Sequence, residues 1–427
     1  MRVLLLSVLP AAGCASTPKA PPSTIATILI DDLGFYDTAV FNDAIRPVTP
    51  HLAQLADDGI RLERHYTYKY CSPTRRSFLS GRYPVHITGT QAPVCSNCLP
   101  LEFTLLSEKF ASAGWLNHFV GKGHLGYTTM DHLPINRGFA SHVGYLFGME
   151  DYQYLLRLSA SASASLSLSL SLSLSLALCL SLCLCLCVTS IGRSRYGNHT
   201  RSNPVWNQSN ASDVYWFTKD FWDGLLPATD AATDEIYYST NWYTDRAIEI
   251  IDAHPLAKNL WLHLPYQAVH SPYTDTPAWE AMPESCTPQA GNASCPFWDH
   301  TFGDMLTVVD AGIGNVTAAL QKRGMYNNAL YVVSSDNGGI GPGNNFCGAP
   351  CGGDSLRGHK MTPWEGGTRV MAFVSGGWLE PSLRGTFSRS FVHISDWYPT
   401  LLSLVGVDPS DDISYRGVKA GTYSAQH

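Results

Sequence analysis

The chain has no excess of basic residues. Its 427 residues include 28 Lys and Arg against 35 Asp and Glu, which gives a formal net charge of −7. This balance provides no general attraction to nucleic acid or to an acidic membrane surface. We therefore expect no nucleic-acid partner, and an anionic substrate would have to be bound by a local cluster of positive groups.

The chain also lacks a second Cys-x-x-Cys pair, or a histidine pair at zinc-finger spacing, to accompany Cys95-Ser-Asn-Cys98. A zinc or redox half-site is the alternative at this position, but we favour a disulfide. Four of the twelve cysteines lie in a low-complexity tract, at 179, 183, 185 and 187. The closely spaced pairs could each close a short loop in an oxidising compartment. These pairs are Cys95/Cys98, Cys286/Cys295 and Cys347/Cys351.

The first apolar run, Val3 to Leu9, is too short to cross a membrane. It follows Arg2 and precedes the small residues at 11–15, an order typical of a secretory signal peptide. We predict a signal peptide over residues 1–20 and a secretory, extracellular or lysosome-like location. The alternatives are a disordered leader and, more weakly, a bacterial lipoprotein site at Cys14. Five glycosylation sequons agree with secretion, at Asn198, Asn207, Asn210, Asn292 and Asn315.

Residues 159–188 form a low-complexity tract in which Ser alternates with Ala or Leu, and then Cys with Leu. As one strand the tract would be ~95 Å long, far beyond ordinary strands. It is long enough for a membrane helix, but a span here would separate Asp31 from Asp336, which we expect to share one metal. We therefore expect no stable membrane span and interpret the tract as an expanded insertion or a gene-model error.

Short apolar runs alternate with helical patterns along the rest of the chain. The runs have the length of buried strands, and each ends in polar or glycine-containing sequence, at 26–30, 116–120, 260–264 and 330–334. Helical patterns occur at 49–58, 104–113, 240–253 and 302–323. This alternation predicts an α/β domain over residues 24–408 with a largely parallel sheet, whose ligands bind beyond the carboxyl ends of the strands.

Polar side chains follow the first and the last of these strands. Asp31-Asp32 comes after the run 26–30, and Asp336-Asn337-Gly338-Gly339 follows the run 330–334. Taken separately, each pair is typical of a turn or a helix cap. If both strands are central and parallel, three carboxylates and an amide oxygen meet at one sheet edge. Hard oxygen ligands of this kind suit calcium or magnesium.

The segment from Cys71 to Arg82 is the most specific in the chain. A lone cysteine beside positive residues is either a buried hydrophobic residue or an activated thiolate nucleophile. Here Cys71-Ser-Pro-Thr-Arg resembles the sulfatase signature Cys-x-Pro-Ser/Thr/Ala-x-Arg, and Leu79-Ser-Gly-Arg82 resembles its tail. Other sulfatase motifs follow the same order along the chain, at 31–34, 121–126, 269–272, 336–339, 356–360, 364–367 and 394–400.

On these motifs the chain is identified as a member of the sulfatase family, in the alkaline-phosphatase superfamily. The stretches Gly144 to Tyr152 and Gly314 to Leu320 most resemble the arylsulfatase B, or N-acetylgalactosamine-4-sulfatase, group. The resemblance implies a large, mixed but mostly parallel sheet flanked by helices. It also implies that the usual small C-terminal antiparallel domain is largely missing, so that residues 409–427 are its truncated start.

The resemblance further implies a sulfuric ester hydrolase that acts on sugars of the N-acetylgalactosamine 4-sulfate type or on aryl sulfates. A formylglycine-generating enzyme would convert Cys71 to the nucleophile. One calcium ion, with Mg²⁺ as an alternative, would be held by Asp31, Asp32, the modified Cys71, Asp336 and Asn337. Arg75, Lys122 and Lys360 would supply positive charge around the sulfate, His124 would orient the nucleophile, and His270 would protonate the departing oxygen.

Simpler interpretations exist for several of these residues. Outside the family pattern, Lys122 and His124 would be a solvated strand end, His270 a turn residue, and Lys360 the holder of a structural anion. Gly123 stands where the family usually has tryptophan, so we expect looser packing behind Lys122 and lower catalytic efficiency. Two other functions stay open: a phosphate ester hydrolase of the same superfamily, and an inactive descendant that binds glycans.

Overall fold

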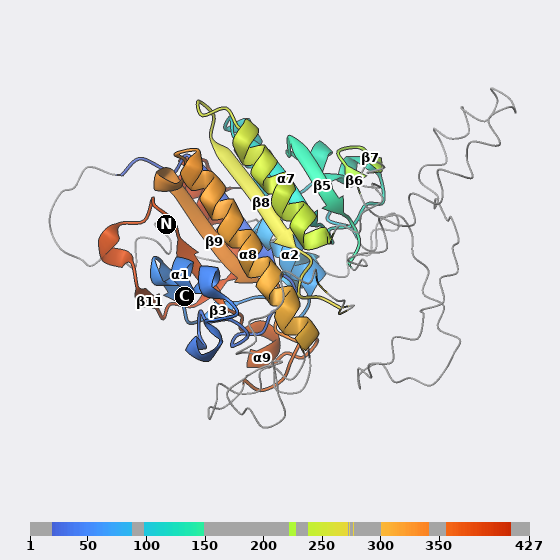
Figure 1. Ribbon diagram of the computed structural model, residues 1–427. Coiled ribbons are helices and arrows are strands. Elements are labelled where there is room, and N and C mark those ends of the chain that lie inside the picture. The colour runs from blue at the N-terminus through green and yellow to red at the C-terminus, as the bar shows by residue number, and fades with distance from the viewer. Residues whose placement is uncertain are drawn as a thin grey trace, which may run out of the picture.

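The centre of the protein is a ten-stranded sheet (Figure 1). The computed structural model describes residues 19–87, 98–148, 222–227, 238–271, 273, 276, 300–340 and 356–410. Five central strands run parallel, in the order β9 (Ala329–Ser335), β1 (Thr24–Ile30), β8 (Leu260–Tyr266), β4 (Leu116–Lys122) and β5 (Ser141–Tyr145). These include the four predicted strands. The prediction of a mixed, mostly parallel α/β sheet is therefore confirmed.

Shorter strands extend the sheet at both sides. Beyond β9 lie β10 (Ala372–Ser375), β2 (Ile60–Leu62) and β11 (Thr386–Ser388), of which β10 is antiparallel to both of its neighbours. Beyond β5 lie the antiparallel strands β6 (Trp222–Asp223) and β7 (Leu226–Pro227). A separate two-stranded sheet pairs β3 (His65–Tyr66) with β12 (Val392–His393).

The three strands at the centre are in level register. Thr24 at the start of β1 lies opposite Leu260 of β8 and Ala329 of β9, and Ile30 at its end lies opposite Tyr266 and Ser335. The segments that follow β1, β8 and β9 therefore leave the sheet at the same edge.

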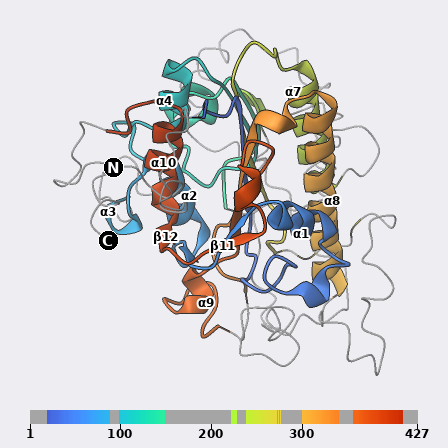
Figure 2. The same ribbon diagram turned by 90° about the vertical axis from the view of Figure 1, so that its left-hand side faces the viewer.

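Helices cover both faces of the sheet (Figures 1 and 2). One face carries α1 (Pro50–Asp57), α7 (Ser239–Ala253) and α8 (His300–Lys322), and the other carries α2 (Cys71–Ser80), α4 (Leu106–Ser112) and α10 (Trp397–Leu404). The predicted helical segments at 49–58, 104–113, 240–253 and 302–323 correspond to α1, α4, α7 and α8. The remaining helices of the described residues are α3 (Pro84–Ile87), α9 (Glu365–Thr368), η1 (Asp43–Ile45), η2 (Met130–His132), η3 (Pro134–Asn136), η6 (Tyr326–Asn328), η7 (Pro381–Leu383) and η8 (Ile394–Asp396).

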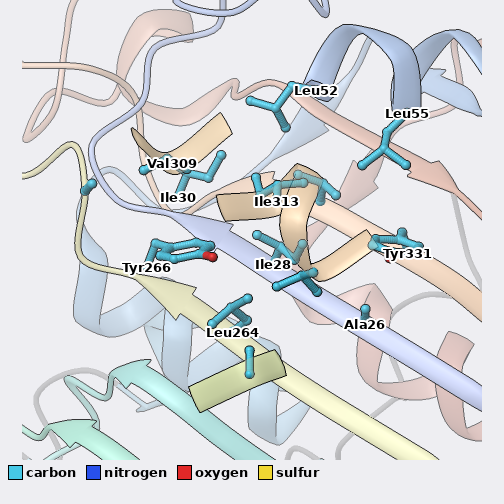
Figure 3. Close-up of a cluster of buried hydrophobic side chains, with 14 of the residues drawn as sticks. Ala26, Ile28, Ile30, Leu52, Leu55, Leu264, Tyr266, Val309, Ile313 and Tyr331 are labelled. Atoms are coloured by element: carbon cyan, nitrogen blue, oxygen red, sulfur yellow. The ribbon is translucent and has the colours of Figure 1, made fainter. Parts of the chain in front are cut away.

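Strand alternation divides the core between these two faces. Ala26, Ile28 and Ile30 of β1 point toward α1 and α8, where they meet side chains such as Ile313 (Figure 3). Ile25, which precedes Ala26, points to the opposite face and belongs to the core under α2, α4 and α10. Because both faces are covered, β1 is apolar or small on both sides and completely buried.

Several sequence predictions fall outside the described residues. These include nearly all of the signal peptide, the tract 159–188, four of the five sequons, and the pairs Cys286/Cys295 and Cys347/Cys351. Asn315 of the fifth sequon is exposed on α8. Cys71 is a free, buried thiol, whereas Cys98 is disulfide-bonded; its expected partner, Cys95, lies outside the described part. In that described part, no helix has both the length and the apolar character needed to cross a bilayer.

Candidate active site

Asp31 and Asp32 leave the carboxyl end of β1 and are buried at the centre of the sheet edge. The Asp31 backbone N–H donates to Ala268 O at 2.9 Å, and Val269 N–H donates to Asp31 O at 2.8 Å, which joins this turn to the segment after β8. Asp32 has a φ of 58°, a left-handed conformation that non-glycine residues rarely adopt. The two carboxylates thus stand side by side on a constrained turn.

Asp336 and Asn337 leave the end of the neighbouring strand β9 and meet Asp32, as expected if β1 and β9 are central and parallel. Asp32 N–H donates to Asp336 Oδ1 at 3.3 Å, and Asn337 Nδ2 donates to Asp32 Oδ1 at 2.8 Å. Asn337 Oδ1 is buried and has no hydrogen-bond partner among the described residues. Ser335 connects the two turns, since its Oγ accepts Leu33 N–H at 3.1 Å and donates to Asn337 O at 2.7 Å.

Cys71 is the first residue of α2 and points its thiol at the aspartates. Its Sγ lies 3.4 Å from Asp31 Oδ1 and 4.0 Å from Asp32 Oδ1. Burial, followed by the negative charges of Asp31 and Asp336, raises the pKa of this thiol well above its ordinary value. The unmodified side chain is therefore a protonated thiol, and the interpretation of Cys71 as an activated thiolate is not supported.

Three cationic side chains pair with the three carboxylates. Lys122 Nζ forms an ion pair with Asp31 Oδ2, and Arg75 Nε donates to Asp336 Oδ2 at 2.8 Å. Lys360 Nζ lies 2.6 Å from Asp32 Oδ1 and 2.8 Å from Oδ2. A further bond from Arg75 Nη1 to Lys122 O, at 3.0 Å, joins α2 to the end of β4. The cluster contains as many cations as carboxylates.

The pKa values of the cluster follow from this pairing. Burial alone would raise the pKa of Asp31 and of Asp32, but the positive charge of Lys122 on the first and of His270 and Lys360 on the second lowers both below the ordinary value. Burial would lower the pKa of Lys360, yet Asp32 raises it. The aspartates are thus held as carboxylates and Lys360 as a cation.

His124 and His270 occupy the rim of the cluster. His270 Nε2 lies 3.6 Å from Asp32 Oδ2, and its Nδ1 lies 2.6 Å from Ser271 O. Burial lowers the pKa of His270, although Asp32 opposes the shift. Burial, then the charges of Lys122 and Arg75, lowers the pKa of His124 well below its ordinary value. The neutral form is therefore favoured most strongly at His124, whereas Asp32 opposes loss of the proton at His270.

His124 stands on a strained backbone, with a φ of 53°. Its Nδ1 is buried and has no partner in the described part of the chain. Gly148 makes room for the ring, because a Cβ at that position would lie 2.6 Å from His124 Cε1. No hydrogen bond within the described residues joins the imidazole to another site residue. His124 interacts with the cluster through the nearby charges of Lys122 and Arg75.

The donor set could hold a divalent cation. One ligand atom each from Asp31, Asp32, Cys71 and His270 lie within 4.8 Å of one another. Asn337 adds a buried side-chain oxygen that has no hydrogen-bond donor in the described part of the chain. Carboxylate and amide oxygens are the ligands that calcium and magnesium prefer, so the residues present fit such an ion. A ring nitrogen of His270, a residue expected from the sequence only to transfer a proton, thus lies close to the expected metal ligands.

Two glycines allow the site segments to approach one another. A Cβ at Gly338 would lie 1.8 Å from Gly366 O, so only glycine lets the turn after β9 pack against the segment that carries Lys360. Gly121 has a φ of 126°, and a Cβ there would lie 2.1 Å from Pro265 O of β8. The glycines of the two motifs are thus explained by close backbone contact.

Sequence reasoning did not single out two residues that position the site. Thr74 Oγ1 accepts Tyr68 N–H at 2.9 Å, which fixes the turn that leads into Cys71. Asp37 is fully buried and accepts Gly34 N–H at 2.8 Å, just after the two aspartates. Burial raises the pKa of Asp37 to about 8. The Asp37 carboxylate accepts an N–H three residues before it, which is not the pattern of an Asx turn, so no standard turn motif marks this residue in the sequence. The role of Thr74 depends on tertiary position.

Gly123 is buried beside β5. Tyr145 O lies 3.1 Å, and Leu146 Cα 3.4 Å, from the position that a Cβ would take. The neighbouring strand thus fills the space next to the Gly123 backbone, and Lys122 is completely buried despite the small residue. The expected effect of Gly123 on catalytic efficiency stays a prediction.

Comparison with known proteins gives relatives along most of the chain. The sequence model of the Sulfatase family matches residues 23–407. The chain is 33% identical to "Arylsulfatase J" of Mus musculus over 425 residues. The aligned region covers 96% of this chain and 56% of that protein. The chain is 25% identical over 422 residues to "N-acetylgalactosamine-6-sulfatase" of Homo sapiens, covering 95% of the chain and 66% of that protein. The chain thus spans between about half and two thirds of these relatives.

Two solved structures resemble the fold. The crystal structure of Ps i-CgsB in complex with k-i-k-neocarrahexaose matches with a TM-score of 0.61 and 24% identity, over 91% of this chain and 73% of that one. The crystal structure of the PsFucS1 sulfatase from Pseudoalteromonas sp. matches with a TM-score of 0.59 and 22% identity, over 91% and 68%. At these identities the similarity establishes a shared fold.

Proposed function

Because the chain belongs to the sulfatase family, we propose that it hydrolyses sulfate esters and that Cys71, once oxidised to formylglycine, is its nucleophile. The observation that best supports this proposal is the position of Cys71. Cys71 is the first residue of α2, and its Sγ lies within 4.0 Å of two aspartates. The cations that pair with the site carboxylates, Arg75, Lys122 and Lys360, surround it. We assign the catalytic domain to residues 24–408.

The nucleophile would be the hydrated aldehyde of the modified residue 71, which carries two hydroxyl groups on one carbon. One hydroxyl attacks sulfur, and the bond between sulfur and the ester oxygen breaks, so that the alcohol leaves. The second hydroxyl then loses its proton and re-forms the aldehyde as the bond between the carbon and the first oxygen breaks, so that inorganic sulfate leaves with that oxygen. Water rehydrates the aldehyde and completes the cycle.

Calcium, or alternatively magnesium, would be held by Asp31, Asp32, the modified Cys71, Asp336 and Asn337. When bound, such an ion supplies positive charge that neutralises a sulfate oxygen and favours ionisation of a coordinated hydroxyl. The unpartnered Asn337 Oδ1 supports this ligand set, because a buried amide oxygen without a donor is costly.

Arg75, Lys122 and Lys360 would stabilise the charge that develops on the transferring sulfate. Their charges are matched by the three aspartates, so the addition of a divalent cation would make the cluster positive overall and suited to an anionic ester. Since Lys122 and Arg75 are buried and already hydrogen-bonded, they need little rearrangement when the substrate arrives.

The two histidines would move protons. His270, beside Asp32 at the site edge, would protonate the departing alcohol oxygen. His124, whose Nδ1 has no partner among the described residues, would orient the diol and accept the proton of its second hydroxyl. Their different neighbours, Asp32 for one and the Lys122 and Arg75 cations for the other, support different roles.

The substrate class follows from resemblance rather than from the site. Sulfated sugars of the N-acetylgalactosamine 4-sulfate type, or aryl sulfates, agree with the relatives named arylsulfatase and N-acetylgalactosamine-6-sulfatase and with the carrageenan oligosaccharide in a structural neighbour. We further propose passage through the secretory pathway, with maturation by a formylglycine-generating enzyme.

The test combines peptide mass and turnover. Protein co-expressed with a formylglycine-generating enzyme should carry an aldehyde in place of the Cys71 thiol and should hydrolyse an aryl sulfate in a chelator-sensitive manner. Cys71→Ala is the matched control and should be inactive. Preference for an aryl phosphate would favour the phosphate ester hydrolase. An unmodified thiol without turnover, beside a modified control sulfatase, would favour the inactive glycan-binding protein.

A further inference from the structure

Arg357 and Trp364 form a stacked pair at the surface of the loop that carries Lys360. The guanidinium carbon of Arg357 lies 3.6 Å from the centroid of the Trp364 ring. Both residues are exposed, and Trp364 retains 46% of its accessible surface. The pair therefore presents an aromatic face and a cation side by side at the surface, and tryptophan is enriched at binding interfaces.

This pair is held at a fixed place relative to the active site. Gly366 N–H donates to Arg357 O at 2.9 Å and closes the loop. Between its ends, Lys360 N–H donates to Gly339 O at 2.9 Å and Met361 N–H to Lys69 O at 2.7 Å. The loop is therefore tied on one side to the turn after β9 and on the other to the segment two residues before Cys71.

The two sides of the loop face different environments. Lys360 reaches inward to Asp32, and its side chain is 14% exposed. The adjacent Met361 is 60% exposed and has a φ of 74°. Gly358 has a φ of 85°, and a Cβ there would lie 2.7 Å from Trp364 Cβ, so glycine permits the close approach of the indole. The backbone is thus arranged to point the cation at residue 360 inward and to display Arg357 with Trp364.

Arg357 has no carboxylate partner among the described residues. The neighbouring acid, Glu365, is already used: it accepts Tyr66 OH at 3.0 Å and lies 3.5 Å from Arg369 Nη1. An arginine that stacks on an aromatic ring keeps the edge of its guanidinium available for a planar or tetrahedral anion.

We propose that Arg357 and Trp364 form a subsite for the sugar unit next to the one that carries the cleaved sulfate, and that this unit is anionic. The pyranose ring would cover the exposed part of the Trp364 indole. The Arg357 guanidinium would bind a sulfate or carboxylate of the same unit through paired N–H donors. This inference rests on the proposed sulfatase function, which it extends from a small ester to an anionic oligosaccharide.

Inhibition of aryl sulfate hydrolysis tests the proposal in the mature, full-length protein. The probes are a chondroitin 4-sulfate tetrasaccharide and a κ-carrageenan tetrasaccharide, used as competitors of the aryl ester. For the tighter competitor, Arg357→Ala and Trp364→Ala should each raise Ki about tenfold, and Arg357→Lys less, because a lysine lacks paired donors. The kcat/KM for the aryl sulfate should change less than about twofold, since a small ester does not reach the pair.

Lys19 and Trp378 provide a matched control. They form a second cation–aromatic pair, 5.2 Å from nitrogen to centroid, at the opposite edge of the sheet, where the backbone N–H of Trp378 donates to Ala329 O at the start of β9. Lys19→Ala and Trp378→Phe should leave Ki unchanged. If Ki rises and the aryl sulfate kcat/KM falls by the same factor in the Arg357 and Trp364 variants, the role of the pair is purely structural and the proposal is overturned.

Two other outcomes also overturn it. One is that both tetrasaccharides inhibit but neither substitution alters Ki. The other is that neither tetrasaccharide inhibits at millimolar concentration, while the aryl sulfate is turned over. In both of these cases the proposed sulfatase function stands and the subsite alone is rejected. Absence of aryl sulfate turnover in the unaltered protein would instead reject the proposed function on which the subsite rests.

Discussion

Lys360 contacts both carboxylate oxygens of Asp32, with Nζ 2.6 Å from Oδ1 and 2.8 Å from Oδ2. The two residues are separated by 328 positions in the sequence. Asp32 has a strained backbone and Lys360 precedes the strained Met361. Among the described residues, the non-glycine positions with positive φ are Asp32, His124 and Met361, and each lies in or beside the site.

Lys360→Met should lower kcat/KM for an aryl sulfate about 10²- to 10³-fold, because a positioned charge on the sulfate is lost. Steady-state kinetics on the mature protein measure this effect. Lys322→Met is the control, since that lysine is 75% exposed on α8. A loss below threefold in the Lys360 variant, with the fold intact by circular dichroism, would remove Lys360 from the catalytic set.

Asn337→Ala should weaken calcium binding at least about tenfold, because a buried oxygen ligand disappears. Isothermal titration of chelator-treated protein with calcium reports affinity without reference to turnover. Asn328→Ala, at the amino end of β9, should bind calcium as the unaltered protein does, since Asn328 is exposed and, among the described residues, its side chain hydrogen-bonds to Ser23 Oγ and not to the site. Equal affinities of the two variants would argue against Asn337 as a ligand.

Asp310 should make the protein less stable as pH rises. Its carboxylate on α8 accepts His51 and Leu52 N–H at the start of α1, at 3.0 and 2.7 Å. Burial raises the pKa of Asp310 to about 7, against the opposing effect of these donors. The folded chain therefore binds this proton more tightly than the unfolded chain. The contribution to stability is complete below the ordinary pKa of 3.8 and is lost as pH rises through about 7.

Urea unfolding at pH 5 and pH 8 measures this dependence. In Asp310→Asn the decrease in unfolding free energy between the two pH values should be smaller, by up to a few kcal/mol, because each unit of pKa difference corresponds to about 1.4 kcal/mol. Asp252→Asn, at a half-exposed position on α7, should keep the pH dependence of the unaltered protein. Identical pH profiles for Asp310→Asn and the unaltered protein would contradict the assignment.

Thr74→Val should lower the unfolding free energy by about 1–3 kcal/mol, because the Tyr68 N–H that donates to Thr74 Oγ1 loses its acceptor. Valine keeps the shape of the side chain, so the hydroxyl is the only group removed. Thr74→Ser keeps the hydroxyl and should stay closer to the unaltered protein than valine does. Denaturant unfolding compares the three proteins; a serine variant as unstable as the valine variant would point to packing instead.

The sequence predicted the centre of the fold because the central strands are long and buried on both faces. The runs at 26–30 and 330–334 were visible as continuous apolar segments, and β1 and β9 contain them. The short outer strands, such as β2 and β11, have three residues each. Segments of that length carry no periodic signal and are strands only because of their neighbours.

Helix α2 shows a different limit. All ten of its residues are buried, including Arg75 and Arg76. A helix that is polar yet enclosed has no apolar stripe, so hydrophobic periodicity could not have found it. Its importance was evident only from the motif that begins at Cys71. Which edge of the sheet that motif approaches is a property of tertiary packing.

The candidate site was predictable where strand ends meet. Asp31, Asp32, Asp336 and Asn337 come together because β1 and β9 are parallel neighbours in level register. Thr74 and Ser335 could not be recognised, since single hydroxyls are common and their role depends on which backbone N–H lies opposite. The proximity of His270 to the aspartates likewise required the arrangement of the segment after β8.

The pairing of β1 with β8 and β9 also means that β1 is synthesised long before the two strands that flank it in the sheet. The strand that begins at Thr24 can be hydrogen-bonded along both edges only after the ribosome has added Leu260 and then Ala329. At ribosomal rates of about 5–20 residues per second, β1 spends roughly 15–60 s without its final neighbour. Cys71 is 3% exposed once the fold is complete. A modifying enzyme would therefore meet this cysteine during the nascent interval, and a chain that folded faster would leave less time for the conversion.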